Sequence, residues 1–260
     1  QNVRKHIEEN ANPLLRQAPE EGAGDLAMNF NGTSNQFKVS EHAENFQGFW
    51  PPEVASIGEP AIMRGYRILP VVINPFRWNR QTGQLEVVES VDIELDFNSD
   101  ENQTNIVSNP LRSRPSQAVY EIVSNLVVNP PEPPRDMGAR NGSIVYVMKQ
   151  WDDVEQALQP LIEWRRQMGW TVEVIRVAND ANNAAIKAEI QEAYDNWSTP
   201  PEMIIICGDT DGPHPMACWD HHTHGQYPYE SDHDYVMLEG NDVLPDAAIG
   251  RFPFYEINSG

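Results

Sequence analysis

Two acidic segments in the C-terminal part of the sequence could bind a hard cation. One is residues 208–211 (GDTD), directly after the apolar run of residues 203–207, and the other is residues 239–246 (EGNDVLPD). In open α/β sheets, ligands collect beyond the carboxyl ends of the strands. Ca2+ takes about 6–8 oxygen ligands from carboxylates, amides and carbonyls. A solvated turn in which Asp209 caps neighbouring amides is the alternative, and spacing alone leaves both open.

The second acidic segment offers more oxygen atoms than the first. Side-chain oxygens occur at positions 239, 241, 242 and 246, and Gly240 allows the chain to turn between them. The segment is not an EF-hand, because the D-x-D-x-D-G spacing and the terminal glutamate are absent. The pattern therefore suggests an irregular calcium loop, with an ordinary solvated loop as the alternative.

A third segment, residues 214–224 (HPMACWDHHTH), is dense in histidine. Imidazole and thiol groups bind Zn2+ and other transition metals, so one interpretation is an additional metal site with the ligands His214, Cys218, His222 and His224. A Cys/His nucleophilic pair is another, but catalytic partners usually meet through the fold rather than as sequence neighbours. The residues favour a third interpretation, an exposed polar loop.

The composition excludes several classes of protein. The 260 residues carry a net charge of −21, and residues 141–260 hold 20 acidic and 6 basic side chains. The basic surface of a nucleic-acid binder is therefore absent. No apolar run approaches the ~20 residues that span a bilayer, and no signal peptide is visible at the polar start. The two cysteines, Cys207 and Cys218, form neither a disulfide framework nor a paired zinc motif.

A proline-rich segment, residues 129–142 (NPPEPPRDMGARNG), predicts an extended linker between two domains. The region before it contains a run rich in β-branched residues at 66–73 and a turn at 79–83. A half-buried strand is expected at 85–97, where apolar and acidic residues alternate from 91 to 97. We therefore expect residues 1–128 to form an all-β, sandwich-like domain.

The region after the linker, residues 143–260, alternates strand and helix patterns. Such alternation predicts an α/β domain with a parallel sheet. Its expected elements are strands at 144–148, 171–177 and 203–207, and helices at 152–168 and 184–197. In the first helix, Asp152 and Glu155 fit a capping box, and Pro160 predicts a kink or a break.

Several of these segments, taken together, resemble the start of gingipain-type catalytic domains, peptidase family C25. The order and spacing of the motifs agree with that family over about residues 143–256. Upstream, residues 65–88 (GYRILPVVINPFRWNRQTGQLEVV) resemble the C25 propeptide. The motifs are residues 147–169 (VMKQWDDVEQALQPLIEWRRQMG), residues 204–211 (IIICGDTD), Ser231-Asp232, Tyr235, residues 239–242 (EGND), Pro245-Asp246 and residues 249–252 (IGRF).

The resemblance implies the front part of a secreted cysteine endopeptidase zymogen that acts on proteins or peptides. It implies a β-rich propeptide followed by the first half of a caspase/gingipain-like catalytic domain. In that family the catalytic His and Cys lie in a second subdomain beyond the IGRF motif, so no residue of this chain is expected to be catalytic. That second subdomain would be the partner of residues 143–260. The alternative is a non-catalytic or sorting-type homologue that acts as a cell-surface scaffold.

The resemblance also implies particular site residues. Structural Ca2+ would be held by Asp209, Asp242, the carbonyl of Leu244 and Asp246, with Glu239 as a further ligand from the composition of the loop. The linker residues Arg135 and Arg140 are candidate processing sites. Arg112 and Arg114 are candidates for an inhibitory loop of the propeptide. Ordinary surface charge is the alternative for all four arginines.

Overall fold

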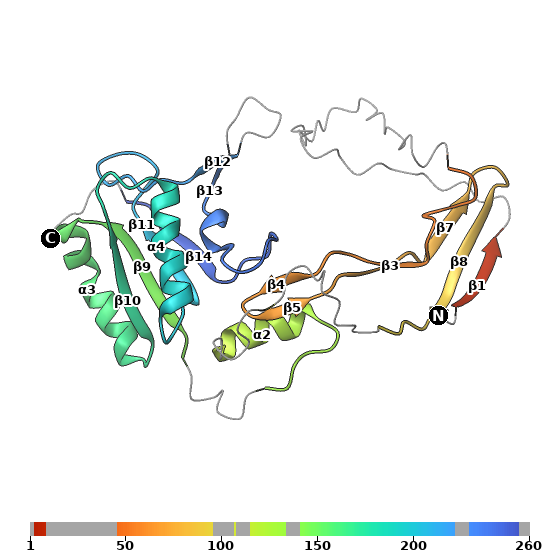
Figure 1. Cartoon of the computed structure of the whole chain (residues 1–260), viewed down its shortest axis with the longest axis horizontal. Helices are drawn as coiled ribbons and strands as arrows, with labels where there is room; N and C mark the ends of the chain where they lie inside the picture. The colour runs from red at the N-terminus through yellow and green to blue at the C-terminus, as the bar shows by residue number, and fades with distance from the viewer. Residues whose placement is uncertain are drawn as a thin grey trace, which may run out of the picture. The chain divides into compact units, whose positions relative to one another are not determined.

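The computed structural model describes residues 3–8, 46–95, 107, 115–133, 141–221 and 229–254. These residues fall into two compact units, which are described separately (Figure 1). Unit 1 contains the described residues 3–8, 46–59 and 69–95, and unit 2 contains all the others. The short segment 60–68 therefore belongs to unit 2, although the sequence on both sides of it belongs to unit 1.

Unit 1 is built from antiparallel strands. Four of them form a sheet in the order β1-β8-β7-β2, and two more form a separate ladder. The strands of the sheet are β1 (Val3–Glu8), β8 (Gln84–Val91), β7 (Phe76–Asn79) and β2 (Phe49–Trp50), and those of the ladder are β3 (Ala55–Ile57) and β6 (Val71–Ile73). The predicted turn at 79–83 joins β7 to β8, with Gly83 at φ +69°.

The N-terminal region differs from its prediction in three ways. The run 66–73 is two strands rather than one, because Pro70, which has no N–H to donate, lies between β5 (Tyr66–Ile68) and β6. The strand expected at 85–97 is β8 at Gln84–Val91, which pairs with both β1 and β7, and the described residues 92–95 beyond it are not in a strand. Unit 1 is rich in strands, as predicted. A sandwich needs two packed sheets, but the described residues of unit 1 form only one sheet of four strands and the two-stranded ladder.

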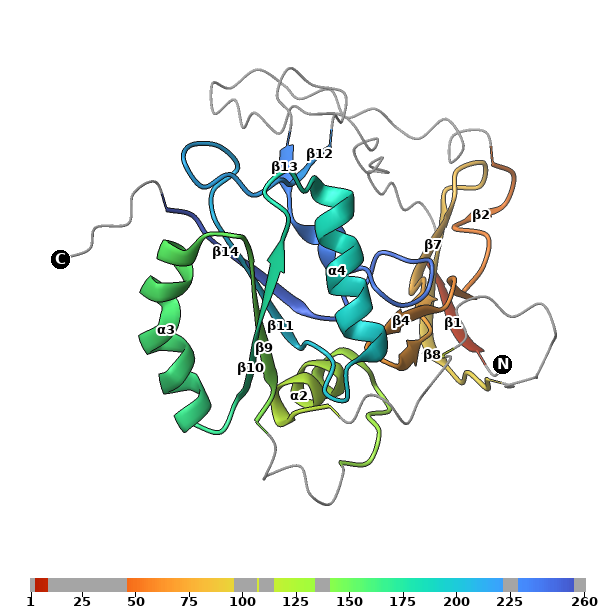
Figure 2. The ribbon, with the colours of Figure 1, turned by 60° about the vertical axis from the view of Figure 1, so that its left-hand side comes forward.

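Unit 2 contains the parallel sheet that the sequence predicts. Its four strands run in the order β10-β9-β11-β14, and every neighbouring pair is parallel. The strands are β10 (Thr171–Val177), β9 (Ser143–Lys149), β11 (Met203–Cys207) and β14 (Ala248–Phe252). The helices α3 (Asp152–Gln167) and α4 (Asn183–Asn196) cover opposite faces of the sheet (Figure 2).

Side chains of the central strand β9 point alternately to the two faces of the sheet, which explains why one helix packs on each face. Tyr146 and Met148 share a cluster with Ile162 of α3. Val145 and Val147 share the other cluster with residues of α4 such as Ile190. Because successive side chains of a strand point to opposite faces, an entirely apolar strand is buried on both sides.

The ends of α3 correct one local prediction. Its N-cap is Trp151, with no side-chain cap hydrogen bond, so the predicted capping box is wrong. Asp152 and Glu155 instead pair with Arg176 of β10. The helix also continues through Pro160, which lies on its exposed side, where water can satisfy the carbonyl that proline leaves free.

Smaller elements of unit 2 surround the sheet. They are the hairpin β4 (Ala61–Met63) and β5 (Tyr66–Ile68), the helix α2 (Gln117–Leu126), the strand pair β12 (Trp219–His221) and β13 (Tyr229–Ser231), and the 3-10 helix η2 (His233–Val236). Among the described residues, no helix combines the length and apolar character needed to cross a membrane.

The tight exit of β11 generates the first prediction. Gly208 has φ +135°, and a Cβ there would lie 2.4 Å from the carbonyl oxygen of His214. We expect Gly208→Ala to lower the free energy of unfolding by about 3 kcal/mol. Gly250→Ala is the control, because its Cβ would meet only Ile205 Cδ1 at 3.7 Å. Chemical denaturation measures both, and equal losses would contradict the assignment of the constraint to Gly208.

Candidate functional site

The GD turn after β11 is closed by its own backbone. Asp209 Oδ1 accepts a hydrogen bond from the amide of Thr210 at 2.8 Å, and the Asp209 carbonyl accepts one from the amide of Met216 at 2.6 Å. Gly208 donates its amide to the carbonyl of Phe252 on β14. Asp209 therefore caps a turn at the carboxyl end of the sheet, as the solvated-turn alternative proposed.

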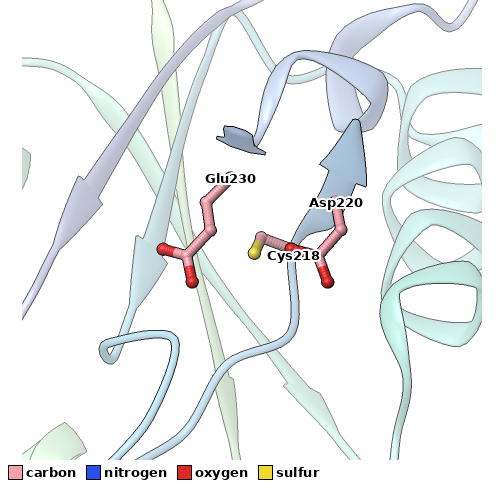
Figure 3. Close-up of side chains that lie close together, drawn as sticks. All are labelled: Cys218, Asp220 and Glu230. Atoms are coloured by element: carbon pink, nitrogen blue, oxygen red, sulfur yellow. The ribbon is translucent and has the colours of Figure 1, made fainter. Parts of the chain in front are cut away.

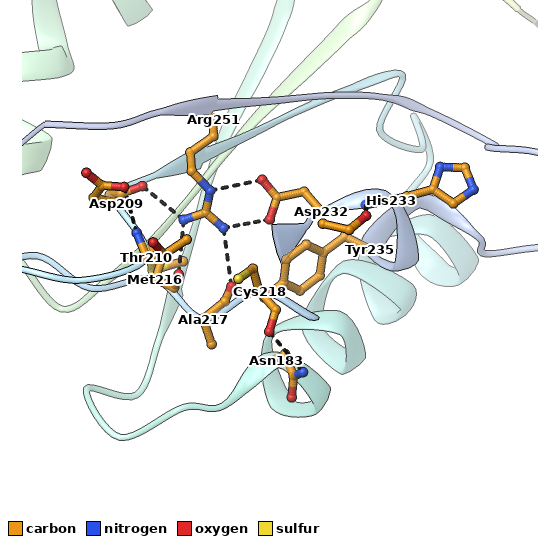
Figure 4. A network of polar contacts seen from close by, with 12 residues as sticks. Asn183, Asp209, Thr210, Met216, Ala217, Cys218, Asp232, His233, Tyr235 and Arg251 are labelled. Atoms are coloured by element: carbon orange, nitrogen blue, oxygen red, sulfur yellow. Dashed lines mark hydrogen bonds and ion pairs between the residues drawn. The ribbon is translucent and has the colours of Figure 1, made fainter. Parts of the chain in front are cut away.

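Arg251 of β14 fixes the same end of the sheet (Figure 4). Its guanidinium donates two hydrogen bonds to the carboxylate of Asp232, at 2.6 and 2.9 Å. It also donates to the carbonyls of Gly208, Met216 and Ala217. Burial opposes the charge of Arg251, but the hydrogen bonds and charge of Asp232 outweigh it and raise the pKa of the guanidinium. Two motif residues that are distant in sequence thus form one ion pair.

The acidic loop, residues 239–246, lies at the opposite end of β14. Its last residue, Asp246, is 2% exposed. One carboxylate oxygen accepts the amides of Leu238 and Glu239, and the other accepts the amide of Arg64 at 2.8 Å. Burial raises the pKa of Asp246 to about 6 although these donors favour the charged form.

Asp242 connects the acidic loop to the hairpin of β4 and β5 by a hydrogen bond. Its Oδ2 accepts the amide of Ile62 at 2.8 Å, and its Oδ1 accepts the amide of Leu244 at 2.9 Å. Glu239 accepts a hydrogen bond from the hydroxyl of Tyr194 at 3.1 Å. Each carboxylate oxygen of Asp242 and Asp246 therefore already has a backbone donor.

The tip of that hairpin places a buried arginine against the start of β11. The side chain of Arg64 is 3% exposed. It donates hydrogen bonds to the carbonyls of Pro200, Pro201 and Asp246, and it lies 3.6 Å from a carboxylate oxygen of Glu202. Sequence analysis missed Arg64 and Glu202. The dipeptide Arg64-Gly65, between two short β-rich runs, was the available signal for a hairpin turn.

The predicted calcium ligands do not form one group in this arrangement. β11 and β14 are parallel, with Met203 opposite Ala248 and Cys207 opposite Phe252. Asp209 follows one end of this strand pair and Asp246 precedes the other, so at about 3.3 Å per residue they lie more than ~10 Å apart. One ion cannot bind both. Calcium binding itself, by the loop or by Asp209, stays a prediction.

The described residues contain one compact group of three metal-ligand side chains, and it lies elsewhere. Cys218, Asp220 and Glu230 have ligand atoms within 4.8 Å of one another (Figure 3). Asp220 and Glu230 are direct partners across β12 and β13. Both carboxylates are exposed, and exposed acidic groups are common on surfaces without a metal. The group therefore places two carboxylates beside Cys218 without establishing a metal site.

His214 lies in different surroundings from that group. Its Nε2 is 3.2 Å from a carboxylate oxygen of Asp153, and its ring packs edge-on against Trp151 and beside Phe254. His222 and His224 lie outside the described residues, as do Arg112, Arg114, Arg135 and Arg140. Those predictions remain untested.

Neither cysteine is arranged as a nucleophile. Burial raises the pKa of Cys207 to about 12. Burial, followed by the charge of Glu230, also raises the pKa of Cys218. A thiol attacks as its thiolate, which a raised pKa makes scarce.

The parallel sheet, the GD turn and the Asp232–Arg251 pair make unit 2 an open α/β unit with polar groups at the carboxyl end of its inner strand β11. Residues 139–259 match the family model of peptidase family C25. This part, a little under half of the chain, is similar to that gingipain-like family of cysteine peptidases.

The curated relatives come from Porphyromonas gingivalis. Lys-gingipain is 26% identical over 178 residues, which are 64% of this chain and 10% of the relative. Gingipain R2 is 23% identical over 80% of this chain and 27% of its own length. Gingipain R1 is 26% identical over 78% of this chain and 20% of its own length. The chain thus spans between a tenth and about a quarter of these relatives.

A solved structure also matches. It is the crystal structure of the Arg-specific cysteine proteinase gingipain R, 24% identical, with a TM-score of 0.36 over 45% of this chain and 25% of that one. The overlap is too small to define the fold, which rests on the strand pairing of unit 2 itself.

The Asp232–Arg251 pair generates the second prediction. Asp232 and Arg251 are 19% and 13% exposed. Asp232→Asn leaves a mostly buried guanidinium without its counter-charge, and we expect a loss of about 2–3 kcal/mol in the free energy of unfolding. Asp152→Asn is the control, because Asp152 is 92% exposed in its pair with Arg176; its loss should be within about 0.5 kcal/mol. Urea denaturation distinguishes the two, and a control loss as large as that of Asp232→Asn would rule out this ranking.

Proposed function

We propose that the intact protein is a secreted cysteine endopeptidase made as a zymogen. In this proposal residues 1–128 form a propeptide region, and residues 143–260 form the N-terminal part of the catalytic domain. Its substrates are proteins or peptides. The family match supports the peptidase part of the proposal.

One observation carries the zymogen part. The hairpin of residues 60–68 comes from the propeptide-like sequence, yet it is part of the compact α/β unit. Its Ile62 is fully buried, and its tip residue Arg64 reaches the carbonyls that precede β11. A segment that is integrated in this way supports folding of the α/β unit, which is what a propeptide with a chaperone role does.

The chemistry of this proposal is acyl transfer. A cysteine thiolate attacks the scissile carbonyl, a histidine carries the proton to the leaving amine, and water then hydrolyses the acyl-enzyme. Cys207 is unsuited to this attack because its thiol is buried. The proposal therefore assigns the nucleophile to a residue that is not among residues 1–260.

Latency is the third prediction. The full-length gene is expressed in a secreting host, and hydrolysis of a mixed peptide library is measured before and after limited proteolysis. We expect activity to appear only after cleavage within residues 129–142, and iodoacetamide to abolish it. Joint replacement of Arg135 and Arg140 by Gln should delay activation, with joint replacement of Arg165 and Arg166 on α3 as the control. Full activity in the uncleaved protein would remove the zymogen proposal, and no thiol-dependent activity in either form would favour the scaffold alternative.

Calcium binding is the fourth prediction. We propose that the loop 239–246 binds Ca2+ through Asp242, Asp246 and the carbonyl of Leu244, a donor set of the kind that hard cations prefer. Ca2+ at ten times its Kd should then stabilise the fold by about 1.4 kcal/mol. Asp242→Asn should abolish this gain, and Asp211→Asn in the GD turn should keep it. If Ca2+ stabilised wild type and Asp242→Asn equally, the assignment of the ion to this loop would be wrong.

A further inference from the structure

The hairpin tip is a two-residue turn with an unusual residue in it. Met63 pairs with Tyr66, so Arg64 and Gly65 form the loop, and both have positive φ, +45° and +77°. Turns of this kind favour Asn or Asp followed by Gly, because a side chain with a Cβ is strained at positive φ. An arginine at the first position is therefore strained in its backbone. Such strain persists where the surrounding structure holds the residue in place.

The Arg64 side chain occupies a buried polar pocket within unit 2. The pocket wall consists of three backbone carbonyls, those of Pro200, Pro201 and Asp246, which accept hydrogen bonds from the two terminal nitrogens of the guanidinium. Glu202, 6% exposed, adds a carboxylate oxygen at 3.6 Å. The ring of Tyr194 lies 5.8 Å from the guanidinium carbon. The pocket is therefore built from oxygen acceptors and one aromatic face.

The groups of this pocket are fixed by other parts of unit 2. Glu202 also accepts the amide of Ser116, the N-cap of α2, at 2.8 Å. Ser143 donates its hydroxyl to the carbonyl of Pro200 at 2.6 Å. Asp246 is held by the amides of Leu238 and Glu239. Since these contacts do not involve Arg64, they can keep the acceptors in place when its side chain is absent.

The arrangement of acceptors selects a guanidinium over an ammonium group. The carbonyls of Pro200 and Pro201 receive different terminal nitrogens of Arg64. A planar guanidinium presents several donors in a fixed fork, whereas a lysine ammonium is a compact and strongly hydrated charge. A guanidinium also stacks on aromatic rings, as the position of Tyr194 allows.

We propose that unit 2 contains a binding site for the guanidinium group of an arginine presented at a β-turn. Arg64 is its resident ligand, and an arginine from outside the chain can enter the site when that side chain is removed. The ligand class is an arginine residue with both flanking peptide bonds, as in a turn of a polypeptide. The proposal stands on the pocket alone and does not depend on peptidase activity.

The test empties the pocket while it keeps the turn. Arg64→Asn suits positive φ and removes the guanidinium from the full chain. The probe is N-acetyl-L-arginine amide, and the comparison compound is N-acetyl-L-lysine amide. At ten times its Kd, the arginine probe should raise the Tm of Arg64→Asn by about 2–4 °C. We expect the lysine compound to bind at least about ten-fold more weakly, and wild type to show no saturable shift.

A second substitution locates the binding. Arg64→Asn with Glu202→Gln removes the counter-charge of the site and should weaken the arginine probe about ten-fold or more. Arg64→Asn with Glu189→Gln, a change of an exposed acid on α4, is the matched control and should leave binding unchanged. Equal shifts with arginine and lysine, the same shift in wild type, or no effect of Glu202→Gln would each overturn the proposal.

A folding failure of the variant does not remove the test. If Arg64→Asn is recovered only unfolded, refolding yield is measured with each probe present. Recovery with the arginine probe and not with the lysine compound supports the site. No recovery with either compound, while wild type refolds under the same conditions, overturns it.

Discussion

Arg64 brings a positive charge into the interior of unit 2, and several parts of that unit are arranged to receive it. Removing a charge from water costs several kcal/mol unless hydrogen bonds and an opposite charge replace the lost hydration. Three carbonyls and the carboxylate of Glu202 do so here. Burial nevertheless lowers the pKa of Arg64 from its ordinary value, so part of the desolvation remains uncompensated. The hairpin, the segment before β11 and the acidic loop meet at this one side chain, and the N-cap of α2 is connected to it through Glu202.

A second arginine performs the corresponding role at the other end of the same strands. Arg64 binds carbonyls that precede β11 and β14, and Arg251 binds carbonyls that follow β11. Backbone groups that lie beyond a strand have no ladder partner, so they need side-chain donors when they are buried. The guanidinium fork suits this task because it reaches several carbonyls at once. The inner strand β11 is thus flanked at both ends by charge-assisted hydrogen bonds from an arginine.

The parallel sheet could be predicted from the sequence because each of its signals is local. The strands at 171–177 and 203–207 agree with β10 and β11 to the residue, and alternation with helices gave their parallel direction. Polar residues near the start of a helix predicted its N-cap less reliably. Asp152 and Glu155 fit a capping box by spacing, but an arginine on the neighbouring strand competes for both carboxylates.

The candidate sites could not be predicted because they depend on distant parts of the chain. Nothing local in the acidic loop shows that Ile62 and Arg64, about 180 residues earlier, donate hydrogen bonds to its carboxylates. Asp209 and Asp246 were grouped by motif, whereas the register of β11 and β14 places them at opposite strand ends. Cys218 has Asp220 and Glu230 as neighbours, and the pairing of β12 with β13 that brings Glu230 there is not a local signal of the sequence.

Amide hydrogen exchange in the wild-type chain tests the central claim most directly. The claim is that residues 60–68 are an integral part of unit 2, held by the hydrogen bonds from Ile62 and Arg64 to Asp242 and Asp246. The account predicts that these two amides exchange as slowly as those of β9 and β11, because all of them open only when unit 2 unfolds. Exchange of both amides at the rate of exposed turns, with β9 and β11 still protected, would contradict it.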